Sequence, residues 1–253
     1  MSSNIWTRCA ASSRVAQLSA QSWRSVEAQH QISTRRLVDS AEEHEVLEEL
    51  LEQYKPTILA DAAKLHYLLA TPFRYPPLRH GSRFGSRFER GIWYGAEDLK
   101  TTFAEVAYYR LLFNHGSDAD LGLLQVQLSV FKASILTPKG LDFTRRVFKN
   151  IWDTISSKHD YTQTQALGKD MRENNVAVFR YYSARSLDKG KCVGVIQPSA
   201  FKSKKPSTAS TWFCSADRNQ VDFKRSSVFG KDETFAYPIN QFTVDGHLPN
   251  PAI

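Results

Sequence analysis

The order of helix-like and strand-like segments predicts an α+β fold with a largely antiparallel or mixed sheet. Helical periodicity dominates the first 70 residues, whereas strand-like alternation recurs after residue 90. The chain holds no internal repeat, and its strands and helices do not alternate as they do in proteins with a parallel sheet. We therefore expect two sections, a helical N-terminal extension over residues 1–70 and a main domain over residues 71–253.

The composition predicts a folded protein with an anionic partner. Of the 253 residues, 42% are hydrophobic and 12% aromatic, and the formal net charge is +7. Such a charge favours a nucleotide, a nucleic acid or an acidic protein as partner. No apolar run approaches the roughly 18 residues of a membrane helix, and residues 1–30 lack the apolar segment of a secretory signal. We expect no membrane partner and a cytoplasmic location.

The cysteines and histidines indicate no metal site. The three cysteines are widely spaced and form neither a CxxC pair nor a Cys/His cluster. Scattered histidines add no ligand set. We expect reduced thiols, no disulfide framework and no metal cofactor.

In the N-terminal section, helical patterns favour three helices. The first spans residues 16–28 of a polar stretch in which we expect no core. The second begins at the capping residue Ser40, with Glu43 three positions on, and ends before Pro56. The third spans residues 58–69. This section is interpreted either as a cap packed on the main domain or as a partner-binding arm.

The main domain combines short strands with one long helix and a helix-compatible stretch. The helix is expected over residues 98–113, and residues 141–172 are the helix-compatible stretch. A polar basic loop is expected over residues 201–210. Strands are expected at 92–94, at 121–131, from Val176, at 192–197, at 220–223 and at 242–244.

An arginine-rich loop before the long helix predicts an anion site. Five arginines precede the aromatic strand Ile92-Trp93-Tyr94 and are interleaved with phenylalanines. Arginine binds phosphate oxygens through a planar fork of donors, and an aromatic ring offers a flat face. We therefore expect a phosphate-bearing small molecule that contains a ring. The alternative is a set of solvated surface arginines. The arginines are Arg74, Arg79, Arg83, Arg87 and Arg90.

Two polar residues stand out in apolar surroundings. Glu105 is one of two charged residues between Phe103 and Phe113, and a carboxylate among aromatics is a candidate chemical group. The alternative is a capping box in which Glu105 returns to the amide of Thr102. Ser183 lies on an otherwise apolar strand face, where its hydroxyl needs a partner such as an arginine or a ligand.

Three motifs together resemble the RES domain family, which is named for its Arg, Glu and Ser. They are GSRF…GIWYGAEDLKTTFAEVAYYR, VAVFRYYSAR and CVGVIQPSAF, within residues 70–230. Arg74 is similar to the first family arginine, and Arg83 to the arginine of a Gly-Gly-Arg-Trp-like loop. Arg87 competes for that role because the loop repeats Gly-Ser-Arg-Phe. The resemblance assigns catalytic roles to Glu105, Arg74 and Ser183, and NAD binding to Arg83, Arg87, Tyr94 and Tyr75.

The resemblance implies a fold similar to ADP-ribosyltransferases, with NAD as substrate and no metal. It implies a toxin that breaks the nicotinamide–ribose bond by hydrolysis or phosphorolysis, or, as the alternative, one that transfers ADP-ribose to a protein. The implied partner is an Xre-type antitoxin, through which contact with nucleic acid would be indirect. An oligomer is compatible with this assignment. A direct nucleic-acid module is the competing class, but the chain lacks helix-turn-helix, zinc-finger and RNP signatures.

Overall fold

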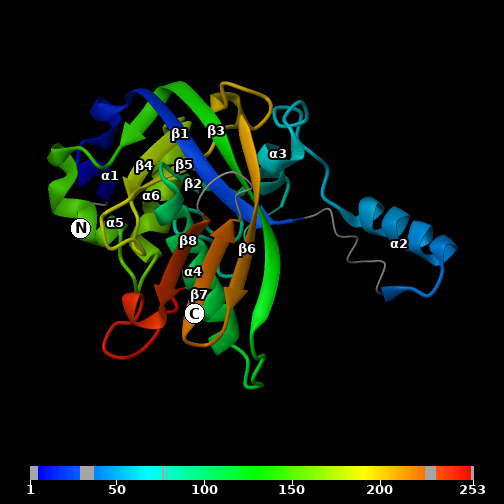
Figure 1. Cartoon of the computed structure of the whole chain (residues 1–253). Helices are drawn as coiled ribbons and strands as arrows, with labels where there is room; N and C mark the ends of the chain where they lie inside the picture. Colours follow the sequence, from blue (N-terminus) through cyan, green and yellow to red (C-terminus); the bar gives the residue numbers. More distant parts are fainter. Residues whose placement is uncertain (1–4, 29–36, 76, 78, 226–231, 252–253) are drawn as a thin grey trace.

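The computed structural model describes residues 5–28, 37–75, 77, 79–225 and 232–251. In these residues eight strands form one sheet in the order β1-β2-β5-β4-β3-β6-β7-β8, with β1 also paired to β3 (Figure 1). The β3–β4 pair is parallel and the other pairs are antiparallel. The predicted α+β class with a mixed, largely antiparallel sheet is therefore confirmed.

The strands are β1 Ala16–Glu27, β2 Trp93–Ala96, β3 Leu124–Asp142, β4 Val178–Tyr182, β5 Lys191–Val195, β6 Thr208–Ala216, β7 Gln220–Arg225 and β8 Glu233–Pro238. The α-helices are α1 Ile5–Arg8, α2 Ala41–Tyr54, α3 Tyr67–Arg74, α4 Leu99–His115, α5 Trp152–Ile155 and α6 Thr162–Glu173. Short 3-10 helices lie at Ala11–Arg14, Arg146–Ile151, Pro198–Ala200 and Ile239–Gln241.

Five strands close into a ring, and the other three extend it. One edge of β3 pairs with β1 along almost its whole length. The other edge pairs first with β6 and then, at Gly140–Asp142, with β4. Since β1, β2, β5, β4 and β3 pair in turn, this part of the sheet curls back on itself. The strands β6, β7 and β8 continue from β3 as an open wing.

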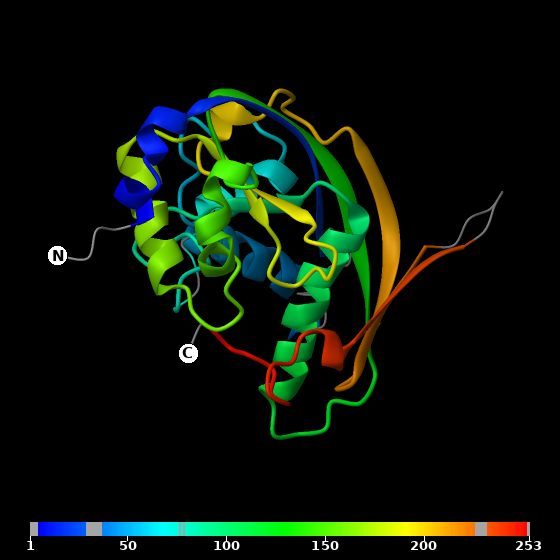
Figure 2. The same ribbon diagram turned by 90° about the vertical axis from the view of Figure 1, so that its left-hand side faces the viewer.

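Helix α4 lies along the concave side of the curved sheet (Figure 2). Its buried face, which includes Phe103, Ala107 and Leu111, packs against Trp212 of β6 and Phe223 of β7. The ring of Phe103 stacks on that of Phe223 at 4.4 Å between centroids. This packing fixes the rotation of α4 and therefore the direction in which Glu105 points.

The N-terminal section differs from the prediction in its first segment. Residues 16–27 form strand β1 and not a helix, and Ile5, Trp6 and Leu18 are buried core residues where none was expected. Alternate residues Leu18, Ala20 and Ser22 of β1 are buried, which is the period of a strand. The intervening polar residues concealed that pattern.

The second and third predicted helices have different outcomes. Helix α2 is confirmed, because the Ser40 hydroxyl accepts from the Glu43 amide at 3.1 Å as predicted. None of its residues is buried, and it projects from the body of the protein (Figure 1). The partner-binding interpretation expects such exposure of this helix, whereas the cap interpretation does not. The third prediction is wrong in position, since α3 covers Tyr67–Arg74.

Later elements mostly confirm the prediction, with three corrections. Strand β3 continues to Asp142, beyond the predicted end at residue 131. Residues 208–210, expected in a loop, begin β6. The final strand is β8, whereas residues 242–244 follow a 3-10 helix and make only one bridge, between Val244 and His247. Pairing between distant segments, which the local pattern does not report, determines the first two corrections.

Candidate active site

A cavity of about 290 Å³, here called the inner cavity, brings together three of the seven predicted site residues. It lies where α4 passes the closed part of the sheet, between strands β1, β2, β4 and β5. Arg83, Tyr94 and Glu105 line it, and Ser183, which is outside the lining, donates a hydrogen bond to Glu105. The remaining lining residues are Arg24, Ser25, Ser82, Gly95, Ala96, Thr102, Val106, Tyr109, Tyr161, Tyr181 and Cys192.

Glu105 is not part of a capping box. Helix α4 is capped by Asp98, whose side chain accepts from the Thr101 amide at 2.6 Å, and Thr102 donates its hydroxyl to the Asp98 carbonyl. The cap is therefore complete without Glu105. The Oε1 atom of Glu105 accepts instead from the Ser183 hydroxyl at 2.5 Å. Among the described residues, Oε2 has no hydrogen-bond partner.

The Ser183 hydroxyl has a defined orientation just beyond the end of β4. Its oxygen accepts from the amides of Arg185 at 3.0 Å and Ser186 at 3.1 Å. A hydroxyl has two acceptor sites and one hydrogen, so these amides leave the hydrogen for Glu105. The Cys192 thiol also lies 3.7 Å from the same carboxylate oxygen. Ser183 thus holds Glu105 in one position.

Arg83 is a buried cation in the lining of the inner cavity. It is 6% exposed, and its Nη1 donates to the carbonyls of Ile155 at 3.1 Å and Ser157 at 2.8 Å. Its guanidinium lies 4.5 Å from the centre of the Tyr161 ring. Burial opposes the charge of Arg83, but Tyr161, Tyr181 and Glu105 outweigh that effect and raise its pKa. Arg83 therefore remains charged without a carboxylate within salt-bridge distance in the described chain.

Tyr94 connects β2 to the arginine-rich loop. Its hydroxyl lies 3.0 Å from the Ser82 hydroxyl and accepts from the Phe84 amide at 3.2 Å. Burial raises the pKa of Tyr94 to about 12, so the phenol is neutral at physiological pH and is no candidate base. The residue fixes the position of the loop that carries Arg83 and presents its ring to the cavity.

Arg24, which the sequence analysis did not single out, is a second cavity arginine. Its Nη1 donates to the Tyr94 carbonyl at 2.6 Å, while its Nε is buried without a partner in the described chain. Burial lowers the pKa of Arg24 to about 10. Because this value is still well above neutral pH, Arg24 remains charged there. In the sequence, Arg24 lies in a stretch of alternating residues, which was the only indication of its role. The prediction of a helix over residues 16–28 hid that alternation.

Three predicted residues lie elsewhere. Arg74 donates to Glu52 at 3.1 Å and to the Pro56 carbonyl at 2.5 Å, and lines neither the inner cavity nor its neighbour. Arg87 is exposed, with its guanidinium 4.5 Å from the centre of the Phe88 ring. Tyr75 lines the neighbouring cavity. Of the arginine-rich loop, Arg83 alone among the described residues reaches the inner cavity.

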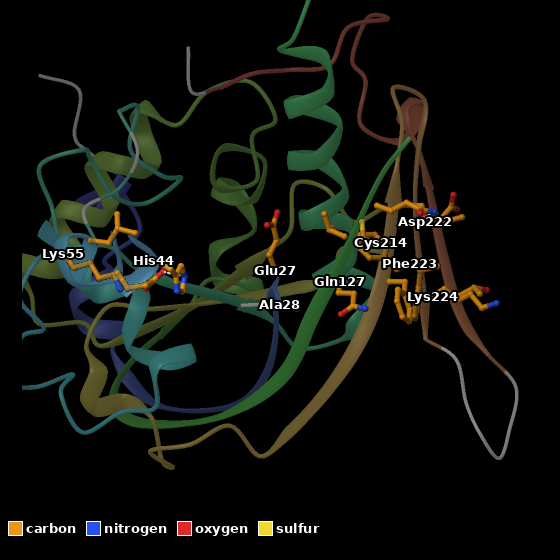
Figure 3. Close-up of a pocket in the computed structure, with 18 residues that line it drawn as sticks. Glu27, Ala28, His44, Lys55, Gln127, Cys214, Asp222, Phe223 and Lys224 are labelled. Carbon is orange, nitrogen blue, oxygen red and sulfur yellow. Dashed lines mark hydrogen bonds and ion pairs between the residues drawn. The ribbon is translucent and has the colours of Figure 1, made fainter. Parts of the chain in front are cut away.

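The neighbouring cavity, here called the outer cavity, has a volume of about 520 Å³. It shares Arg24, Ser82, Tyr94, Tyr109 and Tyr161 with the inner cavity, so the two adjoin. A larger hollow of about 1420 Å³ lies between α2 and strands β6 and β7, with His44 and Lys55 opposite Asp222 and Lys224 (Figure 3). It holds none of the predicted site residues.

The fold and the inner cavity define a class of α+β protein with a serine-held carboxylate facing buried arginines. The chain belongs to the RES domain family, because the model of that family, described as the RES domain, matches residues 58–217, more than half of its length. The resemblance is thereby confirmed, and the family acts on NAD. The search of curated proteins found no match.

Among solved structures, the chain is similar to a chain of the M. tuberculosis MbcT–MbcA toxin–antitoxin complex. The TM-score is 0.48 and the sequence identity 11%, over 81% of this chain and 90% of that one. In the described residues no helix is long and apolar enough to cross a membrane. The described part of the chain also gathers no group of three or more metal-ligating side chains.

Proposed function

We propose that this protein is an NAD-consuming toxin that breaks the nicotinamide–ribose bond of NAD by hydrolysis or phosphorolysis. The observation that carries the proposal is the pairing of Glu105 with Ser183 in a cavity that also holds Arg24 and Arg83. One carboxylate oxygen is fixed by the serine, and the other has no partner among the described residues. Membership of a family that acts on NAD supports this assignment.

The chemistry requires a negative group beside the sugar. Breaking an N-glycosidic bond gives the ribose an oxocarbenium-like transition state. A carboxylate whose position is fixed in advance stabilises that developing positive charge without reorganisation. Nicotinamide leaves as a neutral molecule, so no strong general acid is needed. In this proposal Glu105 stabilises the ribose, and Ser183 holds Glu105 in place.

The arginines are proposed to hold the pyrophosphate. Arg24 has an unpartnered buried Nε, and both Arg24 and Arg83 lack a carboxylate within salt-bridge distance in the described chain. Charge-assisted hydrogen bonds from arginine to phosphate are among the stronger polar contacts. Tyr94 is proposed to pack on the nicotinamide or the ribose.

The direct test is nicotinamide release from NAD by the purified protein in buffers with and without phosphate. We expect release by the wild type, loss of release in Glu105→Gln, and ADP-ribose or its 1-phosphate as the other product. Mass spectrometry of a treated lysate reports transfer to a protein as a stable adduct. Absence of nicotinamide release in both buffers contradicts the proposal, and a stable adduct without such release supports ADP-ribosyl transfer to a protein instead.

We further propose that a protein partner, an Xre-type antitoxin, binds α2. The exposed side of this helix carries Val46, Leu50 and Leu51, and amphipathic helices with such a stripe are a common means of protein recognition. The test is the growth of cells that produce the protein together with a candidate Xre-type repressor. We expect rescue with the wild type and its loss with Leu50→Asp, whereas equal rescue of both contradicts α2 as the contact.

A further inference from the structure

The outer cavity has a chemical character different from that of the inner cavity. Most of its surface comes from tyrosine rings and apolar side chains, and Arg24 is its only lining lysine, arginine or carboxylate among the described residues. Apart from Val26 of β1, the wall outside the shared residues comes from α3 and the residues after it. It includes Tyr67, Leu68, Thr71 and Tyr75.

This wall is held firmly against the sheet. Leu69, Ala70 and Phe73 of α3 are buried in the core, which turns Leu68 and Thr71 toward the cavity. A Cβ atom at Gly91 would lie 2.0 Å from the Pro72 carbonyl oxygen, so only glycine permits the close approach of the segment before β2 to α3. Arg90 adds a bidentate pair with Asp61, at 2.8 and 2.9 Å. These contacts hold α3 in a fixed position, so the fold itself determines the shape of the outer cavity.

The lining matches an uncharged, flat ligand group. Aromatic rings and proline bind the faces of a heteroaromatic ring through packing. A nucleobase has such faces and is neutral. Tyr67 is 52% exposed and Tyr75 is 38% exposed, so their rings remain available at the rim.

Arg24 links the two cavities. It lines both, and its buried Nε has no partner in the described chain. An anionic group that spans the junction would meet this guanidinium. The inner cavity, at about 290 Å³, is at the lower limit of the roughly 300–1,000 Å³ that pockets for drug-sized ligands have. A dinucleotide must therefore extend beyond it.

We propose that the outer cavity is the subsite for the second nucleoside of a dinucleotide, so that the protein selects NAD over nicotinamide mononucleotide. This rests on the proposed function, with the nicotinamide riboside in the inner cavity and the pyrophosphate at Arg24. The adenine ring lies between α3 and the shared tyrosines. Selection follows because a mononucleotide leaves the apolar outer cavity in contact with water.

The test compares variants that fill or open the outer cavity with matched exposed controls. Leu68→Trp fills it, and Leu59→Trp, at a residue that is 49% exposed and outside both cavities, is its control. Tyr75→Ala removes a ring, and Tyr54→Ala, at an 86% exposed residue, is its control. The readout is the ratio of kcat/KM for NAD to that for nicotinamide mononucleotide.

We expect the ratio to fall at least about tenfold in Leu68→Trp and about threefold in Tyr75→Ala, with both controls unchanged, because more of the second nucleoside is displaced when the cavity is filled. Unchanged ratios in both variants, with activity still dependent on Glu105, overturn the subsite and leave the proposed function standing.

A binding assay separates the two ideas if no nicotinamide is released. Calorimetry with ADP-ribose on the wild type, Leu68→Trp and Leu59→Trp then reports on the cavity alone. Binding that Leu68→Trp weakens at least tenfold, with Leu59→Trp unaffected, supports the subsite. Absence of binding, or equal binding by all three proteins, overturns it.

Discussion

The inner and outer cavities share a wall but are built in different ways. The polar groups of the inner cavity are fixed by partners far away in the sequence, as Ser183 fixes Glu105 and the carbonyls of Ile155 and Ser157 fix Arg83. The distinct wall of the outer cavity comes mainly from one continuous stretch that starts at Tyr67. The inner cavity therefore holds charged groups in fixed positions, whereas the outer cavity provides mainly an apolar shape.

The largest effect is expected from Glu105→Gln. Glutamine keeps an acceptor for Ser183 but removes the negative charge, so kcat/KM for nicotinamide release should fall at least about 100-fold, or roughly 3 kcal/mol. Steady-state kinetics measure this, and thermal unfolding checks that the fold is kept. Glu49→Gln on the exposed helix α2 is the matched control. A variant with more than a tenth of wild-type activity would exclude the charge of Glu105 as the main catalytic contribution.

The next largest effect should distinguish Arg24 from Arg74. Methionine keeps much of the side-chain volume and removes the charge, so Arg24→Met should raise KM for NAD about 10- to 100-fold through loss of charged hydrogen bonds. Arg74→Met should have a much smaller effect on KM, because Arg74 pairs with Glu52 on a different surface. Both KM values are measured at constant salt. A larger rise of KM in Arg74→Met than in Arg24→Met would indicate that Arg74, and not Arg24, binds the phosphates of NAD.

A smaller and differently distributed effect is expected from Ser183→Ala. Glu105 keeps its charge but loses its fixed position, which should lower kcat about tenfold and change KM little. The amides of Arg185 and Ser186 also lose their acceptor, so the free energy of unfolding should fall by about 1–3 kcal/mol. Kinetics and chemical denaturation measure the two parts. A purely structural role for Ser183 would lower stability and leave kcat per folded molecule unchanged.

The smallest effect is expected on the free energy of unfolding, through Tyr94 in the wall that the two cavities share, and it appears only at alkaline pH. Burial raises the pKa of Tyr94 to about 12, above the unfolded value of about 10. The unfolded state therefore loses this proton first as the pH rises, and stability is lost between about pH 10 and pH 12.

Tyr94→Phe removes that ionisation. From pH 9 to pH 11 the wild type should lose about 1.4 kcal/mol more unfolding free energy than the variant. Urea denaturation at both pH values measures the difference. A constant offset between the two proteins at all pH values would show that Tyr94 ionises equally in the folded and unfolded states.

The sequence predicted Glu105 and Ser183 of the candidate site, but it did not predict Arg24. Glu105 and Ser183 lie in patterns that are locally unusual, a lone acid in an apolar helix face and a hydroxyl on an apolar strand, and each needs a partner. The structure makes them partners of each other. Which donor Glu105 would accept from could not be predicted, because 78 residues separate the pair.

Arg24 was not predicted as a site residue because the strand that carries it was not recognised in the sequence. It belongs to β1, whose outward residues are polar, so its strand period was weak and a helix was assigned. The identity of β1 as a central strand depends on its long pairing with β3, more than 100 residues later. The clustering of arginines in the sequence also did not indicate which of them line the inner cavity. Arg74 and Arg90 pair with Glu52 and Asp61 instead.

Proton NMR of NAD mixed with the purified wild type and with Glu105→Gln tests the central claim most directly. The nicotinamide protons report both binding, through line broadening, and cleavage, through the appearance of free nicotinamide. We predict free nicotinamide with the wild type, and broadened signals of intact NAD with Glu105→Gln. Intact, unbroadened NAD with both proteins, or equal cleavage by both, would contradict the assignment of the inner cavity as the site at which Glu105 breaks the nicotinamide–ribose bond.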